Sequence, residues 1–185
     1  LSASVSGSDG LNLRETNELD IGNVVSQVDA TKSVVVQTVQ ADGTASASSL
    51  ALTSDVVTSG GGNGSVVIVA GGNLNLNDGT AGTTGVSVKA DGSGNVLLQA
   101  FGTGANIAAS ADVLSTSGNL SILAKGSITF GANADVATSS TSAASGSIDI
   151  WAEAGAVTQH ASSVISSSNA SATARVVAGT SVTVG

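Results

Sequence analysis

The chain has 185 residues and carries 13 acidic side chains against five lysines and arginines, so its formal net charge is −8. A nucleic-acid backbone or an anionic membrane requires a basic surface, so this charge disfavours both as partners, and no membrane insertion is expected. Proline, cysteine, methionine and tyrosine are absent, whereas glycine occurs 24 times. The absence of cysteine excludes disulfides and is compatible with an exported bacterial protein.

A short block of sequence recurs along the chain. Each clear copy begins at a turn residue, alternates apolar and polar positions as far as an alanine, and then continues into a second alternating run. Two weaker copies come first, LNLRETNELDIGNV from Leu11 and SVVVQTVQ from Ser33. The clear copies are GSVVIVAGGNLNL from Gly64, GVSVKADGSGNVLL from Gly85, GNLSILAKGSITFG from Gly118, GSIDIWAEAGAVTQ from Gly146 and TARVVAGTSVTVG from Thr173. Such self-similarity indicates a repeat architecture.

Within a copy, the alternation has the period of a β-strand. In the copy from Gly118, Leu120 and Ile122 share one face of a first strand, and Ile128 and Phe130 share one face of a second. A third, weaker strand carries an apolar residue after a small-residue loop, at Val113, Val136 and Val164. Aligning the copies two places before the alanine gives one column, Ile68, Val88, Ile122, Ile150 and Val176. The pattern predicts about seven coils with roughly three short strands each.

We therefore predict an all-β fold, a parallel β-helix or β-solenoid, that forms a single segment over residues 1–185. Each coil adds its valine, isoleucine, leucine and alanine side chains directly above those of the previous coil, so a narrow apolar column stays dry. Right-handed coiling is favoured by the general handedness of parallel crossovers. Disorder is the alternative for a chain rich in glycine and serine, but disordered chains lack such recurring apolar strands.

The two ends of the sequence do not resemble caps. The chain begins at Leu1 without an initiator methionine, a signal peptide or a transmembrane run. A β-helix with an uncapped end exposes unpaired backbone groups and the edge of its core. We therefore expect a processed part or an excerpt of a longer chain, whose ends continue in both directions or stack end to end.

Two outward columns of the first strand contain candidate contacts. In one of them Asp149 and Arg175 fall on adjacent coils, which predicts an exposed ion pair. The neighbouring column reads Val69, Lys89, Leu123, Trp151 and Val177. We take Trp151, Leu123, Val177 and Lys89 as candidate partner-contact residues, because amphipathic aromatic side chains are enriched at recognition sites. The alternative is that a corner loop or a neighbouring chain folds over this stripe.

Calcium is the one metal considered, and its candidate ligands are Asp91, Asp112 and Asp135. Asp91 opens the turn DGSGN, whereas Asp112 and Asp135 fall at equivalent places in successive copies. A bound ion would relieve the repulsion between two stacked carboxylates. The nonapeptide pattern of calcium-binding β-rolls is absent, however, so plain Asp-Gly and Asx turns are the alternative. No other metal and no cofactor is expected.

Groups able to catalyse a reaction are sparse. Lys89, Lys125 and Arg175 lie near the strand faces but coils apart, and His160 stands alone in a corner, as an exposed loop histidine would. Polysaccharide lyases and glycosidases need clustered carboxylates, or a calcium ion with a basic residue. We therefore expect no catalytic residue and no enzyme. The alternative is a carbohydrate-active β-helix whose site lies on loops or outside this segment.

The copies GNLSILAKGSITFG and GSIDIWAEAGAVTQ, with TSVTVG and LNLRETNELDIGNV, resemble the β-strand repeats of filamentous haemagglutinin-like bacterial surface adhesins. The resemblance covers nearly the whole chain. It implies a long adhesive fibre that is extracellular or displayed on the bacterial cell surface. The partners it implies are a host or neighbouring-cell surface, through a glycan or a protein, together with end-to-end or side-by-side self-association.

Overall fold

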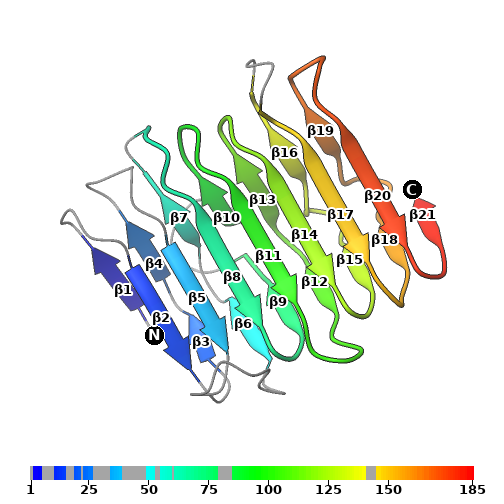
Figure 1. The fold of residues 1–185 in the computed structure, drawn as a ribbon, viewed down its shortest axis with the longest axis horizontal. Helices are drawn as coiled ribbons and strands as arrows, with labels where there is room; N and C mark the ends of the chain where they lie inside the picture. Colours follow the sequence, from blue (N-terminus) through cyan, green and yellow to red (C-terminus); the bar gives the residue numbers. More distant parts are fainter. Residues whose placement is uncertain are drawn as a thin grey trace.

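The fold is an all-β solenoid whose strands lie in three parallel sheets (Figure 1). The computed structural model describes the backbone of residues 2–5, 11–15, 19–21, 23–26 and 34–38, and all of residues 49–52, 55–59, 61–78, 85–140 and 145–185. Successive strands enter the three sheets in rotation, so three strands make one coil. This confirms the predicted parallel β-helix with three short strands per coil. Its right-handedness stays a prediction.

Each of the three sheets has seven described strands. Sheet A contains β1 (Ser2–Val5), β4 (Asn23–Ser26), β7 (Val56–Thr58), β10 (Val86–Ala90), β13 (Asp112–Ser115), β16 (Val136–Thr138) and β19 (Ile165–Ser167). Sheet B contains β2 (Leu11–Glu15), β5 (Val34–Thr38), β8 (Val66–Ala70), β11 (Val96–Ala100), β14 (Leu120–Ala124), β17 (Ile148–Ala152) and β20 (Ala174–Ala178). Sheet C contains β3 (Leu19–Ile21), β6 (Leu50–Leu52), β9 (Leu74–Leu76), β12 (Ile107–Ala109), β15 (Ile128–Phe130), β18 (Val157–Gln159) and β21 (Val182–Val184). About five turns are described with their side chains.

The core is a narrow apolar column between the three sheets. Burial alternates along the strands, so in β14 Leu120, Ile122 and Ala124 are buried and the two residues between them are partly exposed. Parallel pairing places Ile122 between Leu98 of β11 and Ile150 of β17, at the usual strand spacing of about 4.8 Å. The predicted stacking of equivalent apolar residues is therefore confirmed in these coils.

The register differs from the sequence alignment in one coil. The alignment places Val88 beside Ile68, whereas in the structure Leu98 of β11 pairs with Ile68 and Val88 lies in sheet A. The cause is that VSVKA in β10 and VLLQA in β11 are both five residues long and both end in alanine, so the pattern fits either strand. β10 also contains an irregularity between Val86 and Val88, where Ser87 is buried rather than outward.

The third strand is shifted by one residue in the last described coil. Ile165 of β19, and not Val164, pairs with Val136 of β16. Val164 precedes the strand and is 50% exposed. Its N–H donates to Oδ1 of Asp135 at 2.8 Å, which fixes the corner that leads into β19.

Polar side chains form ladders just before the sheets. Before sheet B, the side-chain oxygen of Asn95 accepts the N–H of Asn119 at 2.8 Å, and that of Asn119 accepts the N–H of Ser147 at 2.9 Å. Before sheet C, the side-chain oxygen of Asn73 accepts the N–H of Asn106 at 2.9 Å. Each side chain thereby satisfies a backbone donor of the following coil at a corner, where buried or crowded N–H groups need partners. The ladders tie successive coils together outside the core.

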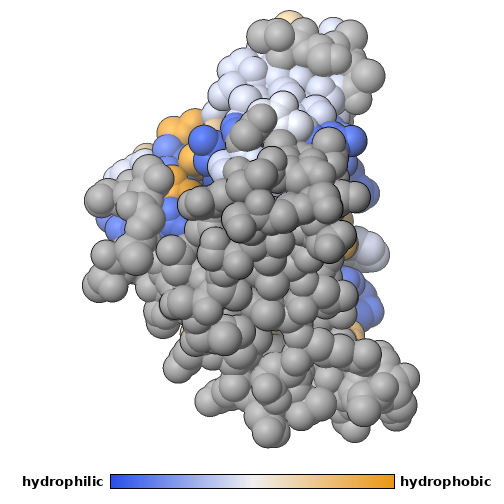
Figure 2. Space-filling view, turned by 90° about the vertical axis from the view of Figure 1, so that its left-hand side faces the viewer, coloured by the Kyte–Doolittle hydropathy of each residue, from blue (hydrophilic) through white to orange (hydrophobic). Residues whose placement is uncertain are grey.

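The described residues that are visible at the amino-terminal end of the solenoid are mainly polar (Figure 2). Figure 2 looks along the solenoid from its amino-terminal side, and the described residues that can be seen are mostly hydrophilic or near neutral, with one small hydrophobic cluster. Within the described ranges, no helix is long and apolar enough to cross a membrane.

Candidate binding surface on sheet B

The outer face of sheet B carries an exposed tryptophan. The outward column there reads Val69, Gln99, Leu123, Trp151 and Val177. Trp151 is 41% exposed and Val177 is 36% exposed, while Leu123 is partly buried between its neighbours. No described corner loop covers the tryptophan at this exposure. The predicted stripe of Leu123, Trp151 and Val177 is therefore present and open to solvent.

Lys89 does not belong to this column, contrary to the sequence alignment. It lies on β10 of sheet A, where it pairs with Leu114 of β13 and Val57 of β7. The cause is that the sequence alignment put the residues of β10 where the structure has β11, because the two strands have similar sequences. Gln99 occupies the position beside Leu123 instead, so this place in the column holds a neutral amide rather than a cation.

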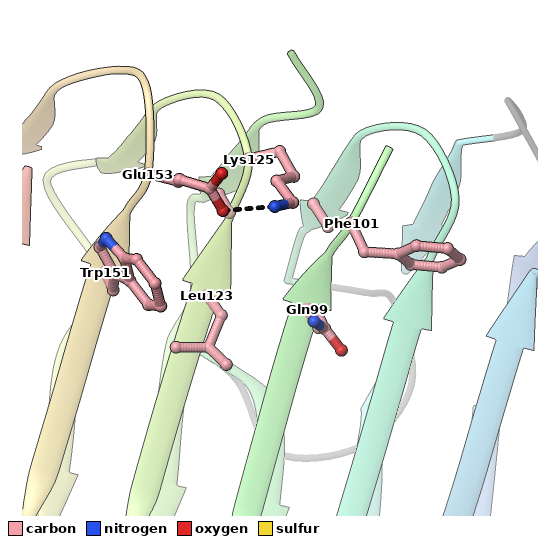
Figure 3. Close-up of a pocket in the computed structure, with 8 residues that line it drawn as sticks. Gln99, Phe101, Leu123, Lys125, Trp151 and Glu153 are labelled. Atoms are coloured by element: carbon pink, nitrogen blue, oxygen red, sulfur yellow. Dashed lines mark hydrogen bonds and ion pairs between the residues drawn. The ribbon is translucent and has the colours of Figure 1, made fainter. Parts of the chain in front are cut away.

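A shallow groove of about 250 Å³ opens beside Trp151, near the ends of β11, β14 and β17. Figure 3 shows Trp151 and Leu123 side by side, Gln99 on the next strand, and the Phe101 ring pointing away from Trp151 at the far end. The complete lining is Gln99, Ala100, Phe101, Leu123, Ala124, Lys125, Trp151 and Glu153. The groove thus combines apolar side chains with an amide and two opposite charges.

An ion pair closes one end of this groove. Nζ of Lys125 donates to Oε2 of Glu153 on the next coil, and each side chain is 45% exposed (Figure 3). Lys125 and Glu153 each follow the alanine that ends their strand, and these alanines are paired. The sequence columns stop at that alanine and therefore missed the pair. Extending the alignment by one residue would have found it.

A second ion pair lies on the same face and was predicted. Nε of Arg175 donates to Oδ1 of Asp149 at 2.8 Å, and its Nη2 donates to Oδ2 at 2.7 Å. This bidentate contact confirms that β17 and β20 have the predicted register. Because both groups are solvent-exposed, the pair contributes little to stability.

Asp91, one of the calcium candidates, links neighbouring coils. Its Oδ2 accepts the N–H of Gly61 and its Oδ1 accepts the hydroxyl of Thr116, both at 3.0 Å. Burial acts to raise the pKa of Asp91, but these bonds, together with the N–H of Gly92 and the charge of Lys89, lower it below the ordinary value. Both carboxylate oxygens thus already accept hydrogen bonds from the chain itself.

Asp112 and Asp135, the other calcium candidates, stack on adjacent coils. Oδ1 of Asp112 accepts the N–H of Asp135 at 2.9 Å, and both residues line a hollow of about 450 Å³ with Asp78. Burial raises the pKa of Asp112, and the negative charges of Asp135 and Asp78 raise it further. The hydrogen bond from the N–H of Asp135 acts to lower this pKa, but the net shift is upward. In the part of the chain that the structure describes, no three His, Cys, Asp or Glu side chains are placed to hold a metal ion.

Asp112→Asn is expected to raise the melting temperature at about pH 7 and to leave it unchanged at about pH 3. Because the folded-state pKa of Asp112 is raised, the folded protein binds this proton more tightly than the unfolded chain does. The stabilising contribution of the protonated carboxyl group is therefore fully present below pH 3.8, the pKa of an unperturbed aspartate, and is lost as the pH rises through the higher folded-state pKa. Asparagine keeps an oxygen for the N–H of Asp135 but carries no charge. Thermal unfolding followed by circular dichroism measures the difference.

Asp112→Ala is the control for the hydrogen bond. It removes the acceptor as well as the charge, so its melting temperature should lie below that of Asp112→Asn at both pH values. If wild type and Asp112→Asn melt together at both pH values, neither burial nor the neighbouring carboxylates penalise the charged form of Asp112. The same assay tests calcium, because equal melting temperatures with calcium and with chelator would exclude an ion at these carboxylates.

His160 takes part in a local turn. Its Nδ1 accepts the N–H of Ser162 at 3.0 Å, and its carbonyl oxygen accepts the hydroxyl of Ser163 at 3.0 Å. Both partners lie within three residues, and the side chain is exposed. These contacts are the ones that a corner histidine makes when it organises its own loop.

Comparison with known proteins identifies no family for this chain. No protein-family model, no curated protein and no solved structure matches it.

Proposed function

We propose that residues 1–185 are a non-enzymatic structural and adhesive segment of a fibre that is secreted or displayed on a bacterial cell surface. The observation that carries this proposal is the regular parallel stack of coils, in which each described strand pairs with its equivalent in the next coil. Such a stack builds length simply by adding coils. The resemblance of the repeat to filamentous haemagglutinin-like adhesins supports the same function.

The segment would act as a stiff spacer that also presents a contact surface. Individually weak contacts become strong when many copies engage a cell surface together. The partner is a host or neighbouring-cell surface, bound through a glycan or a protein. The net charge of −8 keeps the fibre soluble and away from nucleic acid.

The described grooves give little support to a carbohydrate-active enzyme. The groove on sheet B contains one carboxylate, Glu153, and it is paired with Lys125. Glycoside hydrolysis generally uses two carboxylates that flank the scissile bond. The hollow at Asp112 and Asp135 has three carboxylates with Asp78, but Oδ1 of Asp112 and Oδ1 of Asp135 each accept a backbone N–H of the following coil, which is a structural role at a corner.

Adhesion of coated beads tests the proposed function. Beads that carry the purified chain are expected to bind host or bacterial cells increasingly as the coating becomes denser, because multivalent contacts add up. Beads coated with an unrelated β-rich protein of similar net charge are the control. Binding that stays at the control value at every density, or cleavage of a polysaccharide by the purified chain, would overturn the proposal.

Val184→Lys is expected to abolish end-to-end assembly of the segment. In the final described coil Val182 is 47% exposed and Val184 is 69% exposed. The outer edges of β19, β20 and β21 have no strand partner among the described residues, and such edges pair readily with another chain. Wild type should therefore form elongated oligomers as its concentration rises, whereas a lysine would place a charge between the stacked coils.

Val177→Lys is the matched control, because Val177 lies in the same coil but faces outward from sheet B. It should assemble like wild type. Sedimentation velocity and electron microscopy measure the length of the particles. A wild type that stays monomeric at all concentrations, or a Val184→Lys variant that still elongates, would contradict end-to-end stacking.

A further inference from the structure

The groove on sheet B presents a tryptophan that the core does not use. Trp151 is the only tryptophan in the chain, and it lies on the outer face of β17 with 41% of its surface exposed. Figure 3 shows its ring beside Leu123 of the neighbouring strand. A ring held in this way offers a flat apolar surface with a polar N–H at its edge.

Hydrogen-bonding groups surround this apolar surface. Lys125 and Glu153 lie at one end of the groove, and Gln99 lies on the strand beyond Leu123 (Figure 3). The ammonium group donates, the carboxylate accepts, and the amide does both. The two charged side chains keep 45% exposure despite their contact, so both have room for a further partner. A ligand that matches the groove needs an apolar face ringed by groups that donate and accept. Sugars have this chemistry.

Charge narrows the choice of sugar. Lys125 is the only cation that lines the groove, and Glu153 already neutralises it. An anionic sugar would therefore approach a chain of net charge −8 without an uncompensated cation to receive it. A neutral sugar avoids this penalty.

We propose that the groove on sheet B binds a neutral saccharide, with one pyranose ring stacked on Trp151 and its hydroxyls hydrogen-bonded to Gln99, Lys125 and Glu153. The groove is shallow, and at about 250 Å³ it suits a single sugar ring. Because it opens on the face of the sheet, the ring can belong to a longer glycan. This inference rests on the proposed adhesive function and names its ligand class.

Titration with neutral oligosaccharides tests the site. Gluco-, manno- and galacto-configured oligosaccharides are added to the chain while its fluorescence is followed, and Trp151 makes the signal specific to this groove. At least one sugar should give a saturable change. By calorimetry, Trp151→Ala should weaken binding of that sugar about tenfold or more, whereas Trp151→Phe should keep most of the affinity. Thr158→Ala, which lies in the same coil but on the outer face of sheet C, should bind like wild type.

Several results would overturn the saccharide site. One is that no neutral sugar gives a saturable change in fluorescence. A second is that only anionic sugars, such as heparin fragments, bind. A third is that a Trp151→Ala variant with native circular dichroism binds the sugar with unchanged affinity. A fluorescence change on concentrating the chain alone would place a second copy in the groove and also refute the proposal. The bead assay separates the two proposals. If beads coated with Trp151→Ala adhere as well as beads coated with wild type, only the saccharide site is refuted. Wild-type beads that fail to adhere refute the adhesive function.

Discussion

Phe130→Ala is expected to lower the free energy of unfolding by about 3–5 kcal/mol. Phe130 ends β15, is 1% exposed, and is the largest fully buried side chain among the described residues. In the same column of sheet C it pairs with Ala109 of β12. The ring therefore fills space that the small alanine leaves open. Truncation would leave a cavity that the coils cannot close, because backbone pairing holds them at a fixed spacing.

Phe101→Ala is the matched control for Phe130→Ala. Phe101 lies at the rim of the groove and is only partly buried. Phe101→Ala should therefore lower the free energy of unfolding by clearly less than Phe130→Ala does. Urea unfolding followed by far-UV circular dichroism measures both variants, and Trp151 fluorescence reports whether the coil next to β15 unfolds with the rest. Equal losses in the two variants would show that the core around Phe130 repacks freely.

The alternation of the sequence predicted which residues face inward, but it could not predict which sheet a strand joins. Leu120 and Ile122 are predicted inward and are buried, because period two alone decides the face of a strand. Sheet membership depends on where the chain turns its corners. β10 and β11 have the same length and the same terminal alanine, so the alignment chose Lys89 where the structure has Gln99. Corner lengths, and not strand patterns, carry the missing information.

The sequence predicted the apolar residues of the candidate site but not its charged residues. Trp151 and Leu123 stand out as large side chains at outward positions. Lys125 and Glu153 lie at corners, where a charged residue has an ordinary explanation as a solvated turn residue. The asparagine ladders were missed for the same reason, since asparagine before a strand is typical of a turn. Only stacked coils show that Asn95 accepts a hydrogen bond from the next coil.

Gly118→Ala is expected to lower the free energy of unfolding by about 3 kcal/mol, at the upper end of the usual range for overpacking. A Cβ atom at Gly118 would lie 2.0 Å from the carbonyl oxygen of Gly94 in the preceding coil. One at Gly94 would lie 1.9 Å from the carbonyl oxygen of Gly64. These glycines form a stack before sheet B in which successive backbones touch. A methyl group would therefore meet backbone, which cannot move aside as a side chain can.

The same corner contains two buried hydrogen bonds that the methyl group would disturb. The N–H of Gly118 donates to Oγ of Ser115 at 2.7 Å, and that hydroxyl donates to the carbonyl oxygen of Gly94 at 2.8 Å. Pushing the coils apart would leave these buried groups poorly satisfied. Gly131→Ala is the matched control, because a Cβ there stays 3.2 Å from its nearest atom, the carbonyl oxygen of Ala109. Equally small losses in the two variants, measured by urea unfolding, would show that the coils separate easily at the Gly118 corner.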